Sequence, residues 1–320
     1  MSPVAASTTT PAQRETAPEV VPMQDVLGAH VRCGDLRTVG AHGAKAIRQA
    51  YLDHLVLVFR DQHLSDRELM DVGRYFGELA LPISAAYQAE GVKGWDEALK
   101  HVSIISNVVE NGVAIGALGD GEAVWHTDFS FQEVPYSATL LYALEIPPSG
   151  GNTGFLNMYL ALETLPADLR RTITGRSIKH DASHNSAGQL RRGFAPVTDV
   201  SVSPGPSHPI ICRHPETGRD ALYLGRRPYA YVNGLSVADS EALLDALWAH
   251  ATNPEFGWHH EWRVGDLIVW DNRCTMHHRD PFDPASRRVM HKTVCQGTPP
   301  AAPDASAADR HPRGYMFQSH

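Results

Sequence analysis

Apolar residues recur at helical spacing in three segments of the 320-residue chain. Apolar side chains every three to four residues are typical of a helix that packs one face against a core. In the second segment, Ser65 and Glu68 form a capping-box pattern. Leu69, Val72 and Phe76 follow on one face of that segment. The predicted helices are AHGAKAIRQAYLDH (41–54), SDRELMDVGRYFGEL (65–79) and SEALLDALWAHA (240–251).

Short apolar runs separated by Gly, Pro and Asn predict strands in most of the remaining sequence. They are LVLVFR (55–60), ATLLYALEI (138–146), HPIICRH (208–214), DLIVWD (266–271) and RRVMHKTV (287–294). Helices come early and strands late, without steady alternation of the two. This order predicts an α+β fold with a double-stranded β-helix, or jelly-roll, core flanked by helices.

The two ends of the chain differ in composition from its middle. The first twenty or so residues are rich in Ala, Thr and Pro without periodicity, and the end is similar. Such segments bury too little apolar surface to order themselves. We therefore predict a disordered tail over residues 1–22, a single jelly-roll domain over 23–297 and a mobile tail over 298–320.

Charge and cysteine usage narrow the class of protein. A net charge of -8 argues against nucleic-acid binding, which needs a basic face. Four widely spaced cysteines suggest neither a disulfide framework nor a zinc ribbon. No apolar run approaches the roughly 18 residues that span a bilayer, and the start lacks the apolar centre of a signal peptide. We expect a cytoplasmic protein without membrane or nucleic-acid partners.

The strand-like run AVWHTDFSF (123–131) contains a histidine and an aspartate two residues apart. Residues i and i+2 share one face of a strand, so His126 and Asp128 are expected to project together. His277 or His278, just past the end of the apolar strand at 266–271, is the best candidate for a third ligand. Two imidazoles and one carboxylate suit a non-haem Fe(II) oxygenase, but a zinc hydrolase could use the same set.

Arg288 lies eleven residues after His277, on a strand-like run. Alternation places Met290, Lys292 and Val294 on the same face as Arg288. Such a strand would bring a guanidinium into the barrel near the metal. A buried guanidinium needs a carboxylate partner, which it can hold through two parallel hydrogen bonds. Hydrolysis alone does not need that clamp, so Arg288 favours the oxygenase.

Five motifs occur in a recognisable order over most of residues 50–297. They are WHTDFSF, PPSGGNTGF (147–155), HPETGRDALYL (214–224), GDLIVWDNRCTMHH and RRVMHK. Together they resemble the taurine dioxygenase/TfdA group of Fe(II)- and 2-oxoglutarate-dependent oxygenases. The resemblance implies iron ligands His126, Asp128 and His277, with His277 preferred to His278 because of its distance after WDNR.

The same resemblance implies the co-substrates and the reaction. Arg288 and the hydroxyl of Thr153 would hold the far carboxylate of 2-oxoglutarate. From the residues alone, Thr153 in GGNT belongs to a turn. The implied reaction consumes O₂ and 2-oxoglutarate, releases succinate and CO₂, and hydroxylates a C–H bond of a small-molecule substrate. Members of this group commonly form dimers or tetramers, so we expect a homo-oligomer.

The substrate is expected to be a small, anionic organic molecule. Several relatives carry a second arginine four residues after the clamp, where this chain has Lys292. We hypothesise that Lys292 contacts an anionic group of the substrate, and that Tyr87 lines its pocket. The segment around Tyr87, ISAAYQAEG (83–91), aligns loosely with a substrate-lining loop but lacks its histidine. A sulfonate, an aryloxy acid, an amino acid or another small acid would fit.

Two other functions are compatible with parts of this pattern. A metal-dependent hydrolase on a similar barrel would use the triad without the arginine clamp, and a small-molecule binding protein would keep the barrel without turnover. The remaining histidines, including His278, His291, His180 and His184, are expected to be surface or packing residues. Cys274, three residues before His277, is expected to be a buried, inert thiol. The basic segments RRGF and GRRPYAY could attract an anion or simply face solvent.

Overall fold

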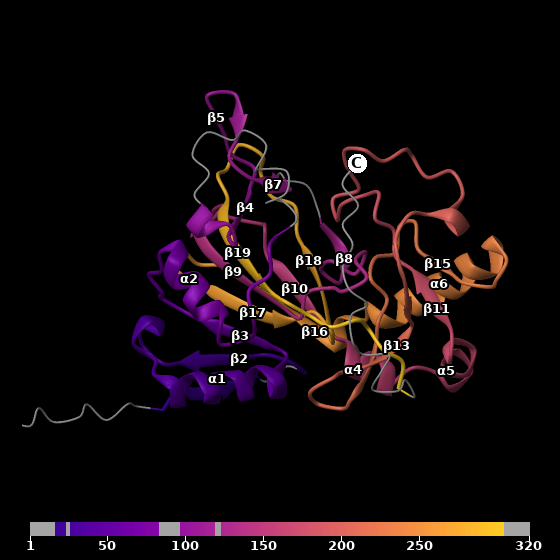
Figure 1. Cartoon of the computed structure of the whole chain (residues 1–320), viewed down its shortest axis with the longest axis horizontal. Helices are drawn as coiled ribbons and strands as arrows, with labels where there is room; N and C mark the ends of the chain where they lie inside the picture. Colours follow the sequence, from indigo (N-terminus) through magenta and orange to yellow (C-terminus); the bar gives the residue numbers. More distant parts are fainter. Residues whose placement is uncertain (1–16, 24–25, 83–96, 119–122, 304–320) are drawn as a thin grey trace, which may run out of the picture.

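Two β-sheets face each other at the centre of the computed structural model, which describes residues 17–23, 26–82, 97–118 and 123–303 (Figure 1). The larger sheet has eight strands, in the order β1 (Glu19–Pro22), β2 (Ala29–Arg32), β3 (Val56–Phe59), β17 (Leu267–Asp271), β9 (Ala138–Glu145), β19 (Val289–Cys295), β4 (Ser103–Ser106) and β7 (Ala117–Leu118). The smaller sheet has four, in the order β16 (Gly257–His260), β10 (Thr153–Asn157), β18 (Thr275–Arg279) and β8 (Ala123–His126). This pair of sheets is the predicted jelly-roll core.

Alternation along the strands of the larger sheet separates two apolar layers. In β9, Leu140 and Tyr142 point to the outer layer, whereas Leu141 and Ala143 point to the inner one. Trp270 of β17 reaches Phe155 of β10 across the inner layer, with ring centroids 5.5 Å apart. Because both faces of this sheet are covered, β3 and the first four residues of β17 are apolar without interruption, which the sequence shows as continuous runs.

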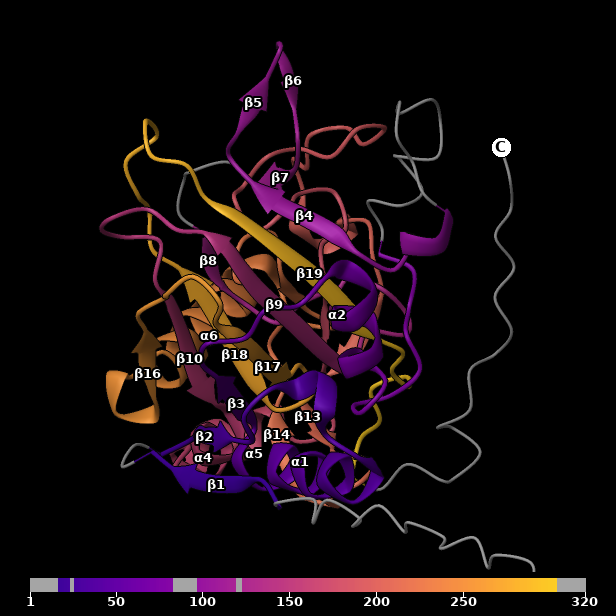
Figure 2. The ribbon, with the colours of Figure 1, turned by 90° about the vertical axis from the view of Figure 1, so that its left-hand side faces the viewer.

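Helices cover the outer face of the larger sheet and the far side of the smaller one (Figures 1 and 2). α1 and α2 form the outer layer with β3, β9 and β17, while α4 and α6 share a core with β10 and β18. The helices are α1 (Ala41–His54), α2 (Asp66–Gly73), α4 (Met158–Glu163), α5 (Ala167–Ile173) and α6 (Val237–Ala251). No helix in the described part of the chain combines the length and hydrophobicity needed to cross a membrane.

Residues near both limits of the predicted domain, together with three small groups of strands, complete the fold. Residues 19–22 form β1 and pair with β2, and the Ala301 carbonyl accepts a hydrogen bond from Arg213, so order extends beyond the expected limits of 23 and 297. The β5–β6 hairpin projects from one end of the molecule (Figure 2). A three-stranded sheet contains β12 (Ser207–Pro209), β11 (Ser177–Lys179) and β15 (Tyr231–Val232). Two two-stranded sheets contain β13 (Ile211–Arg213) with β14 (Asp220–Leu222), and β5 (Val109–Glu110) with β6 (Val113–Ala114).

The predicted helix at 65–79 is shorter in the structure. It begins at the expected capping box, but after Gly73 the backbone amides of Tyr75 and Phe76 donate to carbonyls three residues back, so the helix tightens into turns. The capping box itself is complete: Oγ of Ser65 accepts from the Glu68 amide at 3.3 Å, and the Glu68 carboxylate accepts from the Ser65 amide at 2.7 Å.

Replacing Ser65 with alanine is expected to lower the free energy of unfolding by about 1 kcal/mol, because the Glu68 amide loses its acceptor and the Glu68 carboxylate loses the hydroxyl that donates to it. The midpoint of urea unfolding should fall while its slope stays constant. Ser65→Thr retains a hydroxyl acceptor and should recover most of the loss. Equal destabilisation by both substitutions would contradict the capping role.

Candidate active site

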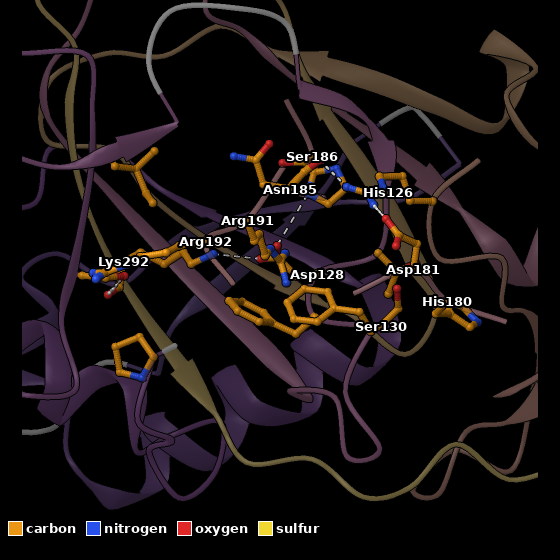
Figure 3. A pocket seen from close by; sticks show the side chains of 17 residues that line it. His126, Asp128, Ser130, His180, Asp181, Asn185, Ser186, Arg191, Arg192 and Lys292 are labelled. Carbon is orange, nitrogen blue, oxygen red and sulfur yellow. Dashed lines mark hydrogen bonds and ion pairs between the residues drawn. The ribbon is translucent and has the colours of Figure 1, made fainter. Parts of the chain in front are cut away.

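His126 and Asp128 meet as expected, although not on one strand. β8 ends at His126, the Thr127 amide donates to the Gly225 carbonyl, and Phe129 has a φ of 57°, so Asp128 lies in the following turn. The expectation that strand alternation carries both side chains is therefore wrong. The turn nevertheless brings Oδ1 of Asp128 to 3.6 Å from Nε2 of His126 (Figure 3).

His277 reaches the same carboxylate oxygen from a neighbouring strand. It was expected just past a strand end, but it lies inside β18, directly paired with His126 of β8. Its Nε2 is 3.9 Å from Oδ1 of Asp128, and all three donor atoms lie within 4.8 Å of one another. His278 points to the opposite face of β18, so the structure joins His277, not His278, to the pair.

The hydrogen bonds and charges around these three side chains suit metal ligation. Nδ1 of His126 is 2.7 Å from the Val124 carbonyl, which leaves the lone pair on Nε2, facing Asp128. Burial, followed by the nearby His126, lowers the pKa of His277 well below its usual value. Burial alone would raise the pKa of Asp128, but the Lys292 ammonium and the His277 imidazole hold it well below the usual range. Neutral imidazoles and an ionised carboxylate are the forms that bind metals.

Two side chains donate hydrogen bonds to Oδ2 of Asp128, the carboxylate oxygen that does not face the two imidazoles. The Thr139 hydroxyl donates to Oδ2 at 3.1 Å, and Nζ of Lys292 lies 3.2 Å from the same atom. The carboxylate is therefore fixed in rotation with Oδ1 turned toward the two imidazoles. The sequence gives no sign of the Thr139 contact, because it depends on the pairing of distant strands.

Arg288 supplies a buried cation without a carboxylate partner among the described residues. Its side chain is 2% exposed, its Nε has no hydrogen-bond partner within the described ranges, and burial together with Arg279 lowers its pKa to about 9. It lines one cavity with His126, Asp128, His277 and Thr153. A buried guanidinium of this kind is stabilised when it pairs with an anion.

Thr153 is oriented to act beside Arg288. The Trp262 indole donates to Oγ1 of Thr153 at 3.0 Å, so the Thr153 hydroxyl keeps its own hydrogen for another acceptor. Gly151, at a φ of 65°, leaves room for the guanidinium: a Cβ there would lie 3.4 Å from Nε of Arg288. The arginine and the threonine thus fit a carboxylate group in this cavity.

A larger pocket of about 470 Å³ adjoins this cavity and shares His126, Asp128 and Lys292 with it (Figure 3). Lys292, His126 and Asp128 line it together with Arg191 and Arg192. Strand alternation does place Lys292 in the interior with Arg288. Among the described residues, its ammonium group contacts the Asp128 carboxylate and lies over the Phe129 ring, 4.7 Å from the ring centroid. Tyr87 lies outside the described residues.

A second buried cluster that includes Cys274 has its hydrogen-bonding groups already paired. Nε2 of His214 lies 3.0 Å from Asp271, and Nδ1 of His214 accepts the amides of Glu216 and Thr217. Both nitrogens of His214 are used, so no lone pair is left for an ion. Burial raises the pKa of the Cys274 thiol well above its usual value. These residues support the turn after β17.

Comparisons with known proteins agree with this geometry. The family model for "Taurine catabolism dioxygenase TauD, TfdA family" matches residues 19–294. Pentalenolactone F synthase of Streptomyces arenae is 34% identical over 78% of this chain and 85% of that protein. The alpha-ketoglutarate-dependent 2,4-dichlorophenoxyacetate dioxygenase of Cupriavidus pinatubonensis is 32% identical over 85% of this chain and 96% of that protein. The crystal structure of AAD-2 in complex with Mn(II) and N-oxalylglycine has a TM-score of 0.70 and 29% identity, and the match covers 89% of this chain and 99% of that one.

Proposed function

Because this chain belongs to the taurine catabolism dioxygenase TauD, TfdA family, we propose that His126, Asp128 and His277 bind its Fe(II). We propose that Arg288 and Thr153 bind the far carboxylate of 2-oxoglutarate. The protein is an Fe(II)- and 2-oxoglutarate-dependent dioxygenase. The observation that supports these roles best is the convergence of two imidazole nitrogens on Oδ1 of Asp128, the carboxylate oxygen to which neither Thr139 nor Lys292 donates.

The arginine and threonine beside the triad separate this function from the two alternatives. A hydrolase with the same ligands has no use for a buried guanidinium that lacks a carboxylate partner. A binding protein without turnover has no use for three open-sided metal ligands. Bound Fe(II) and 2-oxoglutarate supply O₂ activation, with succinate and CO₂ as co-products of substrate hydroxylation.

The residues around the metal ligands have separate tasks in this reaction. Thr139 and Lys292 hold the Asp128 carboxylate in one rotation, and the Val124 carbonyl holds His126 in one tautomer. Arg288 and Thr153 fix the co-substrate at its remote end, so that its reacting end has one position. Trp270 and Phe155 pack beside the His277 ring and keep water from that side.

We propose a small organic anion as the primary substrate, bound in the 470 Å³ pocket. Arg191 and Arg192 line its wall and Lys292 lies beside the metal ligands, so the pocket has cationic groups along its length. The relatives named for 2,4-dichlorophenoxyacetate and phenoxypropionate act on acids of this kind. We also expect a cytoplasmic homo-oligomer without nucleic-acid or membrane partners, and a single jelly-roll domain; these expectations come from the sequence.

The test is a panel of small carboxylates, aryloxy acids, amino acids and sulfonates, assayed for O₂ uptake and succinate release. Both signals should require Fe(II) and 2-oxoglutarate and should rise when the correct anion is present. Turnover supported by Zn²⁺ without O₂ would instead support the hydrolase. Binding of an anion without any succinate release would support the non-catalytic alternative.

Replacing Lys292 with methionine is expected to raise the substrate KM far more than the KM for 2-oxoglutarate. The ammonium uses one contact for Asp128 and keeps further N–H donors for an anion in the pocket. Lys292→Arg keeps the charge and is the matched control, with a smaller change. Steady-state kinetics with each co-substrate varied separately give both constants. Equal increases in the two would show that Lys292 acts only through Asp128.

A further inference from the structure

The outer face of the smaller sheet holds a second group of metal-binding side chains. His259 of β16, His278 of β18 and Asp280 just after β18 each offer a donor atom, and these atoms lie within 4.8 Å of one another. The group lies behind the candidate active site, because His277 and His278 are neighbours on β18 and point to opposite faces. We propose that His259, His278 and Asp280 bind a divalent transition-metal ion of the Zn²⁺ class, separate from the catalytic ion.

The two imidazoles meet over a glycine that separates their strands. Gly154 of β10 is the register partner of both His259 and His278, so the three residues stand in one row across β16, β10 and β18. A Cβ on Gly154 would lie 2.6 Å from Cδ2 of His278 and 2.7 Å from the Trp125 ring. Any side chain at this central position would therefore push the imidazole away. The glycine allows the rings to lean together across the width of an intervening strand.

The distances suit an ion better than direct hydrogen bonds. The Nε2 atoms of His259 and His278 are 3.5 Å apart, and Nε2 of His278 is 3.7 Å from Oδ1 of Asp280. Nδ1 of His259 is 3.6 Å from Oδ2 of Asp280. These separations are at or beyond the limit of a good hydrogen bond. Ligands about 2.0–2.1 Å from a tetrahedral zinc ion stand about 3.4 Å from each other. The two Nε2 atoms already have this spacing, and one donor atom from each of the three residues lies within 4.8 Å of the others. The 3.6 Å contact of Asp280 uses the other nitrogen of His259, so the carboxylate has to move toward the two Nε2 atoms to share an ion with them.

The solvent exposure of two of these side chains and the tight packing of the third also favour a bound ion. The His259 side chain is 50% exposed and Asp280 is 32% exposed, so an ion can enter from solvent. His278 is only 10% exposed, and the Trp125 ring packs against it with centroids 4.2 Å apart, so one ligand is held rigidly. The sequence led us to expect His278 to be a packing residue. Its packing against Trp125 instead presents Nε2 toward the other two donors.

The ion would cross-link parts of the chain that the sheet joins only through β10. β16 and the segment after β18 are on either side of that strand, and a shared ion would tie them directly. Two imidazoles and one carboxylate leave a coordination position for water, so the ion would be weakly held compared with a closed four-ligand site. Imidazole and carboxylate ligands favour Zn²⁺, Ni²⁺ or Cu²⁺ over Mg²⁺ or Ca²⁺.

The test counts Zn²⁺ ions bound by the untagged, full-length protein after chelator treatment, using calorimetry. The wild type should bind two ions, and His126→Ala, which weakens the active site, should retain one. Adding His259→Ala or Asp280→Asn to that variant should weaken the remaining site about 10- to 100-fold. His42→Ala, at an exposed histidine of α1, is the matched control and should change nothing.

Trp125 gives an independent reading of where the ion binds. In the His126→Ala variant, Ni²⁺ should quench tryptophan fluorescence, and Trp125→Phe should remove most of that quenching. His259→Ala in the otherwise wild-type protein should keep Fe(II)- and 2-oxoglutarate-dependent activity while losing one bound Zn²⁺, so this test does not depend on the catalytic assignment. Unchanged Zn²⁺ binding after His259→Ala, or no Zn²⁺ bound by folded His126→Ala protein, would overturn the proposal.

Discussion

Asp128→Asn is expected to abolish succinate formation and to weaken Fe(II) binding by at least about a hundredfold. Loss of a supporting contact around a metal ligand already costs about 10- to 100-fold, and this substitution changes a ligand itself. Asparagine has nearly the same shape as aspartate, but it has lost the negative charge that balances Lys292 and an ion. The fold should survive, because Thr139 can still donate to the amide oxygen.

Two measurements separate this effect from misfolding. Equilibrium binding of Mn(II), which does not consume co-substrate, gives the affinity, and circular dichroism gives the fold. Asp71→Asn, at an exposed carboxylate paired with Arg74, is the control and should leave both affinity and activity unchanged. Folded Asp128→Asn protein with wild-type metal affinity would show that this carboxylate is not a ligand.

Arg288→Met is the second substitution with a large expected effect, and it should act on 2-oxoglutarate. Removing one partner of a buried, hydrogen-bonded charge pair costs about 2–5 kcal/mol. We therefore expect the KM for 2-oxoglutarate to rise from about thirtyfold to a few thousandfold. The substrate KM should change much less, because Arg288 lines the narrow cavity with Thr153 and does not line the larger pocket.

The variants at this position should form a graded series. Arg288→Lys keeps the charge but loses the planar pair of donors, so its KM for 2-oxoglutarate should fall between wild type and methionine. Thr153→Val removes only the hydroxyl and should have a smaller effect of the same kind. Initial rates with 2-oxoglutarate varied at saturating substrate provide the comparison. A substrate KM that rises while the 2-oxoglutarate KM stays constant would contradict the assignment.

The sequence predicts those helices that are determined by residues close to one another along the chain. α1 and α6 follow from apolar positions three and four residues apart, and α2 from its capping box. α4 was not predicted, because most of its residues are buried and it therefore has no polar face to create a period. Its start depends on Asn157, whose side chain accepts the amides of Tyr159 and Leu160.

Some residues of the candidate site could also be predicted from the sequence, whereas others depend on contacts between distant segments. Strand alternation was enough to put Arg288 and Lys292 in one interior cavity. The family motif favoured His277 over His278, and His277 is the one whose donor atom lies near those of His126 and Asp128. Thr139 and Trp262 could not be found from the sequence. They matter only because β9 and the segment after β16 come close to Asp128 and Thr153 in three dimensions. The outer group of His259, His278 and Asp280 likewise depends on register across three strands.

The middle of the eight-stranded sheet is filled by strands that are synthesised late. β17 lies between β3 and β9, and β19 lies between β9 and β4. While the ribosome is still translating residue 260, β3, β9 and β4 each lack a neighbour, and open strand edges are where nascent chains associate wrongly. Protection by a chaperone until the last strand emerges should therefore govern the yield of active enzyme, and chains that stop before β19 should aggregate.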